Sequence, residues 1–202
     1  MSEMLGRVEW SVATRPADGH ADSGDFACVR DLGDAILLVV VDVLGHGSGA
    51  AQAARRFLDV IEADPVADLP SLFARCDVML RSDRGAVMTA VLMRTDEQLI
   101  RYLGVGNVQA VVVRGDNRAV REWLLIRSGV LGSGIRQLEA RTLPVLAGDV
   151  LVLATDGVHA AYAPSIDPLQ TVDRIAQVVL DTHATGKDDA LVLAARFAGA
   201  TV

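Results

Sequence analysis

The sequence predicts an α+β fold in which strands outnumber helices. Strand-like runs follow one another after residue 85, whereas helical patterns are segregated, with residues 50–61 and 69–81 forming one group and residues 168–182 another. Segregated elements favour mainly antiparallel sheets covered by helices over a parallel α/β fold. The chain has 202 residues, of which 51% are apolar, so we expect one domain over residues 1–202 with a sizeable core.

The N-terminal part of the chain is organised around residues 35–41, which are seven apolar residues in a row. A run this short and this rich in β-branched residues predicts a strand that is buried on both faces. Residues 7–14 and 26–30 are shorter strand candidates that end in polar turns. Ala-rich residues 50–61 and residues 69–81 predict two helices, which Asp64-Pro65 separates.

The part of the chain after Gly85 contains most of the expected strands. Short polar or glycine-containing turns separate strand-like runs at 86–94, 99–104, 108–114 and 119–126, which predicts an antiparallel meander. A glycine-rich loop, Gly129 to Gly134, follows. The remaining expected elements are strands at 139–143, 150–154 and 190–197 and a helix at 168–182.

Charge and composition exclude several classes of partner. The net charge is −7 and basic residues are scattered, which argues against nucleic acid or anionic lipid as the main partner. No apolar run approaches the roughly 18 residues needed to cross a bilayer, and no signal peptide is evident. Cys28 and Cys76 lack metal-type spacing and fit reduced thiols in a cytoplasmic protein.

The buried strand at 35–41 stops at an acid, Asp42, which is followed by Gly45, Gly47 and Gly49 and then by a helix. A carboxylate at a strand end, beside a turn that exposes backbone groups, suits a hard cation such as Mg²⁺ or Mn²⁺. The alternative is a strand-to-helix turn whose Asp hydrogen-bonds the local amides. This motif alone leaves both interpretations open.

Three further sites repeat this pattern. Asp156 follows the strand at 150–154, Asp188-Asp189 precedes the last strand, and Asp25 lies in a glycine-containing turn. Acids that converge from separate strand ends can form a two-metal site, which lowers the pKa of a bound water and neutralises a phosphoryl group. Ordinary strand ends are the alternative interpretation.

The motifs together resemble those of the metal-dependent PPM-type (PP2C-like) serine/threonine phosphatases, specifically the small bacterial SpoIIE-like group. The matching segments, in order, are Ser23–Asp25, Asp42–Gly47, Arg84–Ala86, Gly104–Asn107, Ala154–Gly157 and Lys187–Asp189. The resemblance covers the chain from Ser23 to the final strand. It implies an α-β-β-α sandwich of two mainly antiparallel sheets flanked by helices, with two Mn²⁺ or Mg²⁺ ions at one edge.

The resemblance also implies roles for single residues. Asp42 would bridge both metals, and the Val43 carbonyl would bind one of them. Asp156 and Asp188 would hold the other metal, with Asp25 as an outer ligand. Asp42 and Asp156 are therefore the expected catalytic residues. Water activated by the metals would attack phosphoserine or phosphothreonine, and no substrate-binding residue is predicted.

The sequence departs from the family pattern at several positions, and two of these departures concern possible catalytic or phosphate-binding residues. His46 follows Asp42 by four positions, whereas many relatives place a proposed general acid two positions after the bridging Asp; the alternative is a loop imidazole. The basic residue that grips phosphate in larger relatives has no clear counterpart here. Arg15 is a candidate, and a solvated loop arginine is its alternative.

The resemblance implies a cytoplasmic phosphatase that acts on phosphorylated STAS-domain proteins of a stressosome. One alternative is a SpoIIE-like phosphatase that acts on an anti-sigma-factor antagonist. Another is a non-catalytic binding module that keeps the fold without turnover.

Overall fold

The computed structural model describes residues 1–202 except 46, 64–67, 82–83, 117–119 and 199–202. The described strands are β1 (Glu3–Leu5), β2 (Val8–Arg15), β3 (Asp25–Asp31), β4 (Ile36–Val43), β5 (Ala86–Arg94), β6 (Leu99–Val105), β7 (Gln109–Val113), β8 (Arg121–Trp123), β9 (Arg141–Pro144), β10 (Val150–Ala154) and β11 (Ala190–Phe197). The described helices are α1 (Gly47–Ala63), α2 (Leu69–Leu80) and α3 (Val172–His183), with a 3₁₀ helix at Ala160–Ser165.

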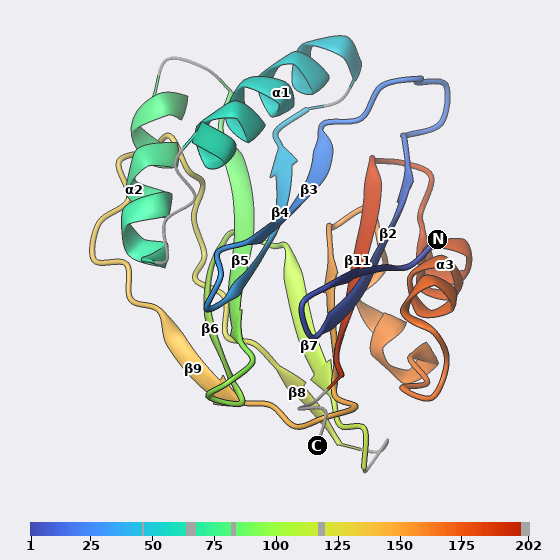
Figure 1. Ribbon diagram of the computed structural model, residues 1–202. Helices are drawn as coiled ribbons and strands as arrows, with labels where there is room; N and C mark the ends of the chain where they lie inside the picture. The colour runs from blue at the N-terminus through green and yellow to red at the C-terminus, as the bar shows by residue number, and fades with distance from the viewer. Residues whose placement is uncertain (46, 64–67, 82–83, 117–119, 199–202) are drawn as a thin grey trace.

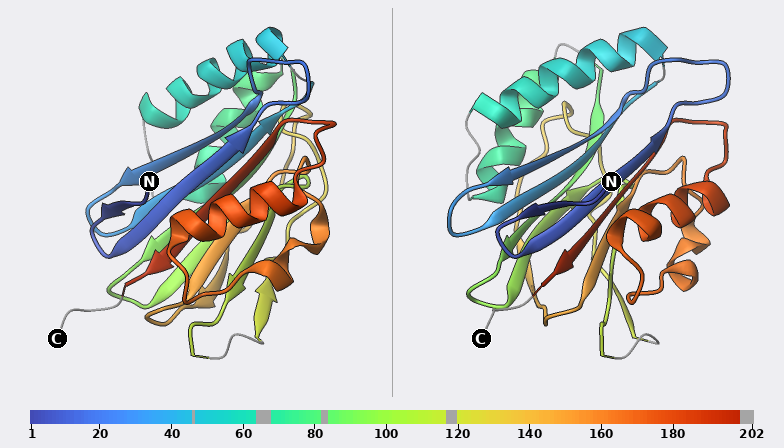
Figure 2. Two further views of the ribbon diagram at one scale, coloured as in Figure 1. Left: turned by 90° about the vertical axis from the view of Figure 1, so that its right-hand side faces the viewer. Right: turned by 45° about the vertical axis from the view of Figure 1, so that its right-hand side comes forward.

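The strands form two sheets, and every recorded strand pair is antiparallel. The order is β1-β2-β11-β10-β7-β8 in the six-stranded sheet and β3-β4-β5-β6-β9 in the five-stranded sheet. Helices α1 and α2 cover the outer face of the five-stranded sheet, while α3 and the 3₁₀ helix cover the six-stranded sheet (Figures 1 and 2). The expected α-β-β-α sandwich is therefore confirmed.

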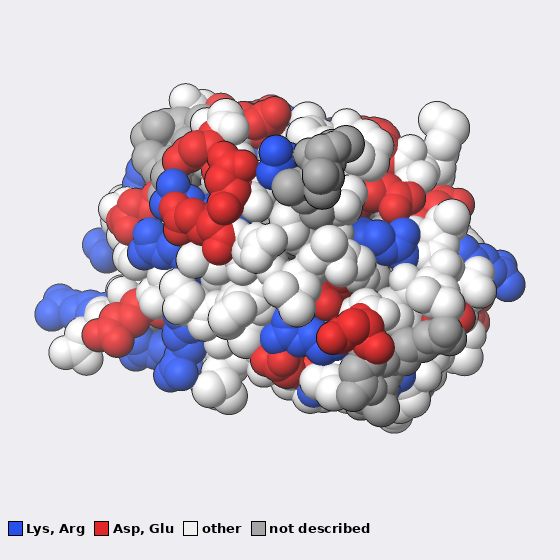
Figure 3. Space-filling view, turned by 60° about the horizontal axis from the view of Figure 1, so that its bottom comes forward, with Lys and Arg blue, Asp and Glu red and all other residues white. Residues whose placement is uncertain are grey.

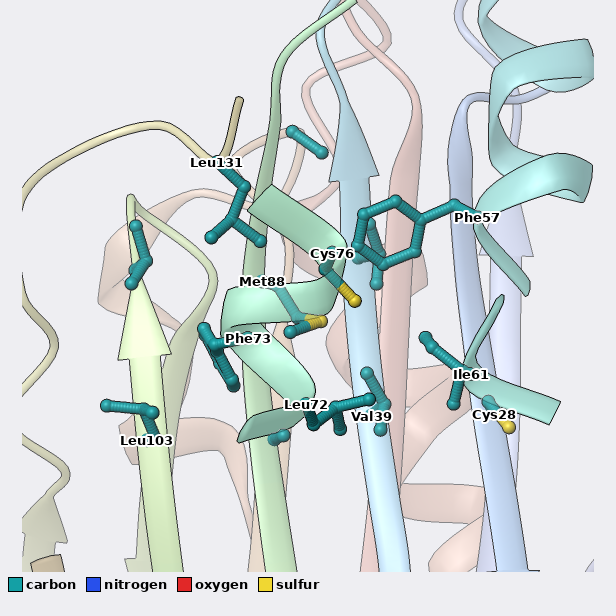
Figure 4. Packing of buried hydrophobic residues seen from close by; sticks show 14 of the residues in the cluster. Cys28, Val39, Phe57, Ile61, Leu72, Phe73, Cys76, Met88, Leu103 and Leu131 are labelled. Atoms are coloured by element: carbon teal, nitrogen blue, oxygen red, sulfur yellow. The ribbon is translucent and has the colours of Figure 1, made fainter. Parts of the chain in front are cut away.

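The alternation of side chains along β4 explains how the layers pack. Val39 and Val41 point toward α1 and α2, whereas Leu38 and Val40 pack between the two sheets. All four are fully buried, and each contributes about 1.5–3 kcal/mol relative to an exposed position. Figure 4 shows the helix-facing layer, where side chains of α1 and α2 meet those of β4 and β5. By the same alternation, Asp42 faces the space between the sheets.

The expected meander is wrong at one point. β5 pairs with β6 in the five-stranded sheet and β7 pairs with β8 in the six-stranded sheet, but β6 and β7 do not pair. The chain instead crosses between the sheets after β6. Gly106 makes this crossing possible, because its φ is +107° and a Cβ there would overlap the Val87 side chain.

Other expected elements differ mainly at their ends. The strand expected at 119–126 is only Arg121–Trp123, and residues 117–119 lie outside the described residues. The helix expected from 168 begins at Val172, because the Thr171 side chain caps it by accepting a hydrogen bond from the Arg174 amide. Within the described residues, no helix combines the length and the apolar character that a membrane span needs.

Candidate metal centre

Both sheets bring acids to the same edge of the sandwich. In the five-stranded sheet, the β3–β4 register places Asp25 directly opposite Asp42. In the six-stranded sheet, Asp156 follows the end of β10 and Asp188 precedes the start of β11. These two strands are antiparallel neighbours, so the two ends lie together.

Asp42, Asp156 and Asp188 line one open hollow of about 330 Å³. The rest of its wall is formed by Leu44, Gly45, Val87, Gly106, Asn107 and the segment 128–130. The structure thus brings together three of the acids that the sequence singled out. The hollow is wide enough for ions that keep part of their own water shell, as Mg²⁺ does in proteins.

Asp25 lies beside these acids but does not line the same hollow. It is 7% exposed and accepts a hydrogen bond of 2.7 Å from the Thr155 hydroxyl through Oδ2. Because Thr155 follows β10, this bond joins the two sheets behind the acidic hollow. Asp25 borders a neighbouring hollow that Ser23 and Arg55 also line.

Burial and repulsion from neighbouring acids raise the pKa values of Asp25, Asp42 and Asp156. Burial, together with repulsion from Asp42, raises the pKa of Asp25 to about 9, against the opposing effect of the Thr155 hydrogen bond. Burial and then repulsion from Asp156 and Asp188 raise the pKa of Asp42 to about 7. Burial and repulsion from Asp188 also raise the pKa of Asp156. The ionised forms of these carboxyl groups are therefore disfavoured unless a positive charge lies nearby.

This charge pattern fits divalent cations. Carboxylate oxygens are the donors that Mg²⁺ and Mn²⁺ prefer. A bound cation would offset both the burial and the mutual repulsion that disfavour the ionised carboxylates. The described residues contain no three Asp, Glu, His or Cys side chains already gathered around one point. The carboxylates instead face a shared space, so ions held there would complete their shells with water.

Three neighbouring residues position the acids, and sequence reasoning did not assign them these roles. Asn107 donates a hydrogen bond of 2.7 Å from Nδ2 to Oδ2 of Asp156. Thr155 holds Asp25, as described above. The buried carboxylate of Asp189 accepts hydrogen bonds from the amides of Ala17 and Gly24, at 2.8 and 2.7 Å, and so fixes the turn before β3. Asp189 is therefore a structural neighbour of Asp188.

Close backbone packing also shapes this edge. A Cβ at Gly157 would collide with the Asp189 carbonyl oxygen, so only glycine fits after Asp156. The Val43 carbonyl oxygen lies near Gly24, where a Cβ would be 3.0 Å from it, and Val43 is fully buried. Val43 is not among the residues that line the acidic hollow.

The remaining candidates have different environments. His46 lies outside the described residues. Arg15 forms an ion pair of 2.7 Å with Asp181 of α3, which favours a structural role on the six-stranded sheet. Arg84 lies closer to the hollow, since its guanidinium donates to the Leu44 carbonyl at 3.3 Å and packs against Gly45. The motif containing Arg84 was noted in the sequence, but its position beside the acids was not.

Comparison with known proteins agrees with this architecture. Residues 33–198 match the family model described as Stage II sporulation protein E (SpoIIE). A curated relative, the phosphoserine phosphatase RsbX of Bacillus subtilis (strain 168), is 23% identical over 173 residues, which is 85% of this chain and 86% of RsbX.

Solved structures share the fold along nearly the whole chain. A structure of RsbX in complex with magnesium has a TM-score of 0.85 at 20% identity, covering 97% of this chain and 98% of RsbX. A structure reported in work on the bacterial stressosome has a TM-score of 0.83 at 24% identity, over 94% and 99% of the two chains. The catalytic domain of the serine/threonine phosphatase PstP, in complex with two manganese ions, has a TM-score of 0.69 at 14% identity, over 94% and 97%. The family match spans most of the sequence, and the chain therefore belongs to the SpoIIE family.

Proposed function

We propose that this protein is a metal-dependent serine/threonine phosphoprotein phosphatase, formed by one domain over residues 1–202. The observation that carries the proposal is the acidic hollow, in which carboxylates from both sheets face one another with raised pKa values. Membership of the SpoIIE family and likeness to a phosphoserine phosphatase support it.

Asp42, Asp156 and Asp188 are the proposed metal ligands that line the hollow, with the Val43 carbonyl and Asp25 contributing from behind it. Two Mn²⁺ or Mg²⁺ ions bound here supply positive charge for the phosphoryl oxygens and lower the pKa of the attacking water. Asp42 and Asp156 are the proposed catalytic residues.

The surrounding residues hold these ligands in position. Asn107 orients one oxygen of Asp156 toward itself and leaves the other available to a cation. Thr155 keeps Asp25 against Asp42. Gly45 and Gly106 form part of the wall of the hollow, and the hollow is open on one side, so a phosphorylated side chain has room to enter. This preorganisation keeps the donors fixed as charge builds up on the phosphoryl group.

The proposed substrates are phosphoserine and phosphothreonine on STAS-domain proteins of a stressosome. RsbX is named a phosphoserine phosphatase, and one similar structure comes from stressosome work. The acidic net charge of −7 does not oppose such a substrate, because bound cations reverse the local charge at the hollow.

The experiment that tests the proposal is hydrolysis of p-nitrophenyl phosphate and of a phosphorylated STAS-domain protein, with Mn²⁺ or with EDTA. We expect turnover that requires Mn²⁺ and is lost in Asp156→Asn. Turnover of the aryl phosphate alone would support the phosphatase and contradict the STAS-domain substrate. Absence of turnover on both substrates, with Mn²⁺ bound, would contradict the phosphatase and favour a binding module.

A further inference from the structure

A second, larger hollow lies at the edge of the five-stranded sheet. It has a volume of about 620 Å³, and we call it the edge slot. Its walls are residues 102–104 of β6, residues 125–127 after β8 and residues 137–141 leading into β9. A volume of this size is within the range of clefts that bind small ligands.

The slot exists because β6 changes its neighbour along its length. The recorded pairing between β6 and β9 ends at Tyr102 and Arg141. Beyond that point β6 bonds instead to the segment after β8, where the Arg127 amide donates to the Gly104 carbonyl at 3.0 Å. The two segments that approach β6 in this way diverge from each other and leave the slot between them.

Arg127 ties the two segments together across the slot. Its Nη1 donates to the carbonyl oxygens of Arg136 and Gln137, at 2.6 and 3.1 Å. These contacts use carbonyl groups and, among the residues that the structure describes, leave the positive charge of Arg127 without a carboxylate partner. Arg127 therefore joins two walls of the slot, and its positive charge is not neutralised by these hydrogen bonds.

The slot is positively charged in a protein whose net charge is −7. Arg127 and Arg141 line it and Arg136 adjoins it, while Glu139 is the acidic residue of its lining. Among the described residues, none of these three arginines forms an ion pair, whereas Arg94 at the end of β5 pairs with Asp34 and Glu97. Figure 3 shows basic side chains, with acidic ones among them, along the left margin of the molecule, the side on which β9 lies in Figure 1.

The slot also offers apolar surface. Leu125 is 65% exposed, and Leu138 and Ala140 are half-buried in its wall. Apolar surface with a rim of unpaired arginines is complementary to a chain segment that carries both an apolar and an acidic residue.

One segment of the chain connects the slot to the acidic hollow. Residues 125–127 line the slot, and the next three residues, 128–130, line the hollow. Three residues of chain span at most about 10 Å. A substrate whose phosphorylated residue enters the hollow can therefore reach the slot with residues a few positions away.

We propose, on the basis of the phosphatase function proposed above, that the edge slot docks an acidic and apolar segment of the phosphoprotein substrate. The segment lies about three to six residues from the phosphorylated residue, as the extended-chain length requires. The arginines of the slot select acidic substrates, which the overall negative charge of the protein would otherwise repel.

The test compares synthetic phosphoserine peptides of equal length. One set carries Asp-Leu-Glu four residues before or after the phosphoserine, and the matched set carries Asn-Leu-Gln at the same places. Hydrolysis with Mn²⁺ is measured for the native protein, for Arg141→Glu and for Arg174→Glu. Arg174 is an exposed arginine of α3 whose side chain has no recorded partner among the described residues, so it is the matched control.

We expect Arg141→Glu to lower kcat/KM for an acidic peptide about five- to tenfold, a loss of roughly 1–1.4 kcal/mol. Turnover of the neutral peptide and of p-nitrophenyl phosphate should stay unchanged, and the loss should shrink in 0.5 M NaCl as screening increases. Arg174→Glu should behave like the native protein.

Equal preference for acidic and neutral peptides in the native protein and Arg141→Glu would overturn the docking proposal and leave the phosphatase intact. Fluorescence anisotropy with a labelled acidic peptide measures binding separately from hydrolysis, and so tests the docking proposal independently of the phosphatase proposal. If neither the peptides nor p-nitrophenyl phosphate is hydrolysed with Mn²⁺, the phosphatase fails. Equal binding of the acidic peptide by the native protein and Arg141→Glu would overturn the slot independently of any hydrolysis.

Discussion

At the scale of single residues, Asp42 is in the least favourable electrostatic environment of the acids that line the hollow. Burial and repulsion from Asp156 and Asp188 raise its pKa to about 7, and its neighbour Asp25 is affected still more strongly. A group whose pKa is raised on folding destabilises the folded state when it is ionised. In the absence of metal, ionised Asp42 therefore lowers the free energy of unfolding.

Asp42→Asn should make the metal-free protein more stable while abolishing metal-dependent turnover. The unfolded chain ionises this residue near pH 4, whereas the folded chain does so near pH 7, so the destabilisation grows between these values. In EDTA at pH 8 we expect the Tm of Asp42→Asn to exceed that of the native protein by several degrees, at about 2–4 °C per kcal/mol. The difference should vanish near pH 4.

Calorimetry or circular dichroism melting in EDTA at the two pH values measures this effect. A Tm for Asp42→Asn equal to or below that of the native protein at pH 8 would contradict a pKa of Asp42 that is raised on folding. Near-normal turnover by the variant would contradict its place among the metal ligands.

At the scale of elements, the glycine-rich loop is attached to α2 by one buried acid. Asp77 is 2% exposed, and its Oδ1 accepts hydrogen bonds from the amides of Gly132, Gly134 and Ile135, at 2.9, 3.0 and 3.3 Å. Burial tends to raise the pKa of Asp77, but these bonds and the ion pair with Arg81 lower it overall. Because the same loop supplies the 128–130 wall of the hollow, α2 helps to position the site.

Asp77→Asn should destabilise the protein by about 1–3 kcal/mol at pH 7, since three amides lose a charged acceptor. The pKa of Asp77 is lowered on folding, so its contribution is present above about pH 4 and is lost as the pH falls below that value. The gap in Tm between the two proteins should therefore close on acidification.

The matched control is Asp68→Asn in the same helix. Asp68 caps α2 by accepting a hydrogen bond from the Ser71 amide, and Asn caps a helix about as well as Asp. Its Tm should stay close to that of the native protein. An equal loss in both variants would indicate a general effect on α2 instead of the loop contact.

The elements also show how far sequence reasoning reached. Strands such as β4 and β5 could be predicted because their apolar runs are long and uninterrupted, and the acids at strand ends could be located from the same runs. The placement of β6 and β7 in different sheets could not be predicted, because a strand pattern does not specify which sheet a strand joins. Three positioning residues were missed because each contacts a segment that is distant in sequence. Thr155 contacts Asp25, 130 positions away, and Asn107 contacts Asp156, 49 positions away. Asp77 contacts a loop that begins 55 positions away, at Gly132.

At the scale of the whole molecule, the acidic edge is the place where the two sheets depend on each other. The five-stranded sheet contributes Asp25 and Asp42, and the six-stranded sheet contributes Asp156 and Asp188. The Thr155–Asp25 hydrogen bond crosses between the sheets here, but the charges on the two sides repel. A cation held by acids of both sheets would replace this repulsion with attraction, so we expect metal binding to stabilise the entire sandwich.

Mn²⁺ should therefore raise the global Tm. A ligand that binds only the folded state stabilises it by about 2.7 kcal/mol at 100 times its Kd, which corresponds to roughly 5–11 °C for a domain of this size. Thermal melting across a Mn²⁺ titration, at constant ionic strength, measures the shift. Asp156→Asn should lose most of the shift, whereas Asp77→Asn, which has a lower starting Tm, should keep it because its substitution leaves the acids in place. A native Tm that does not change up to millimolar Mn²⁺, or a shift that Asp156→Asn retains in full, would contradict a metal centre between the sheets.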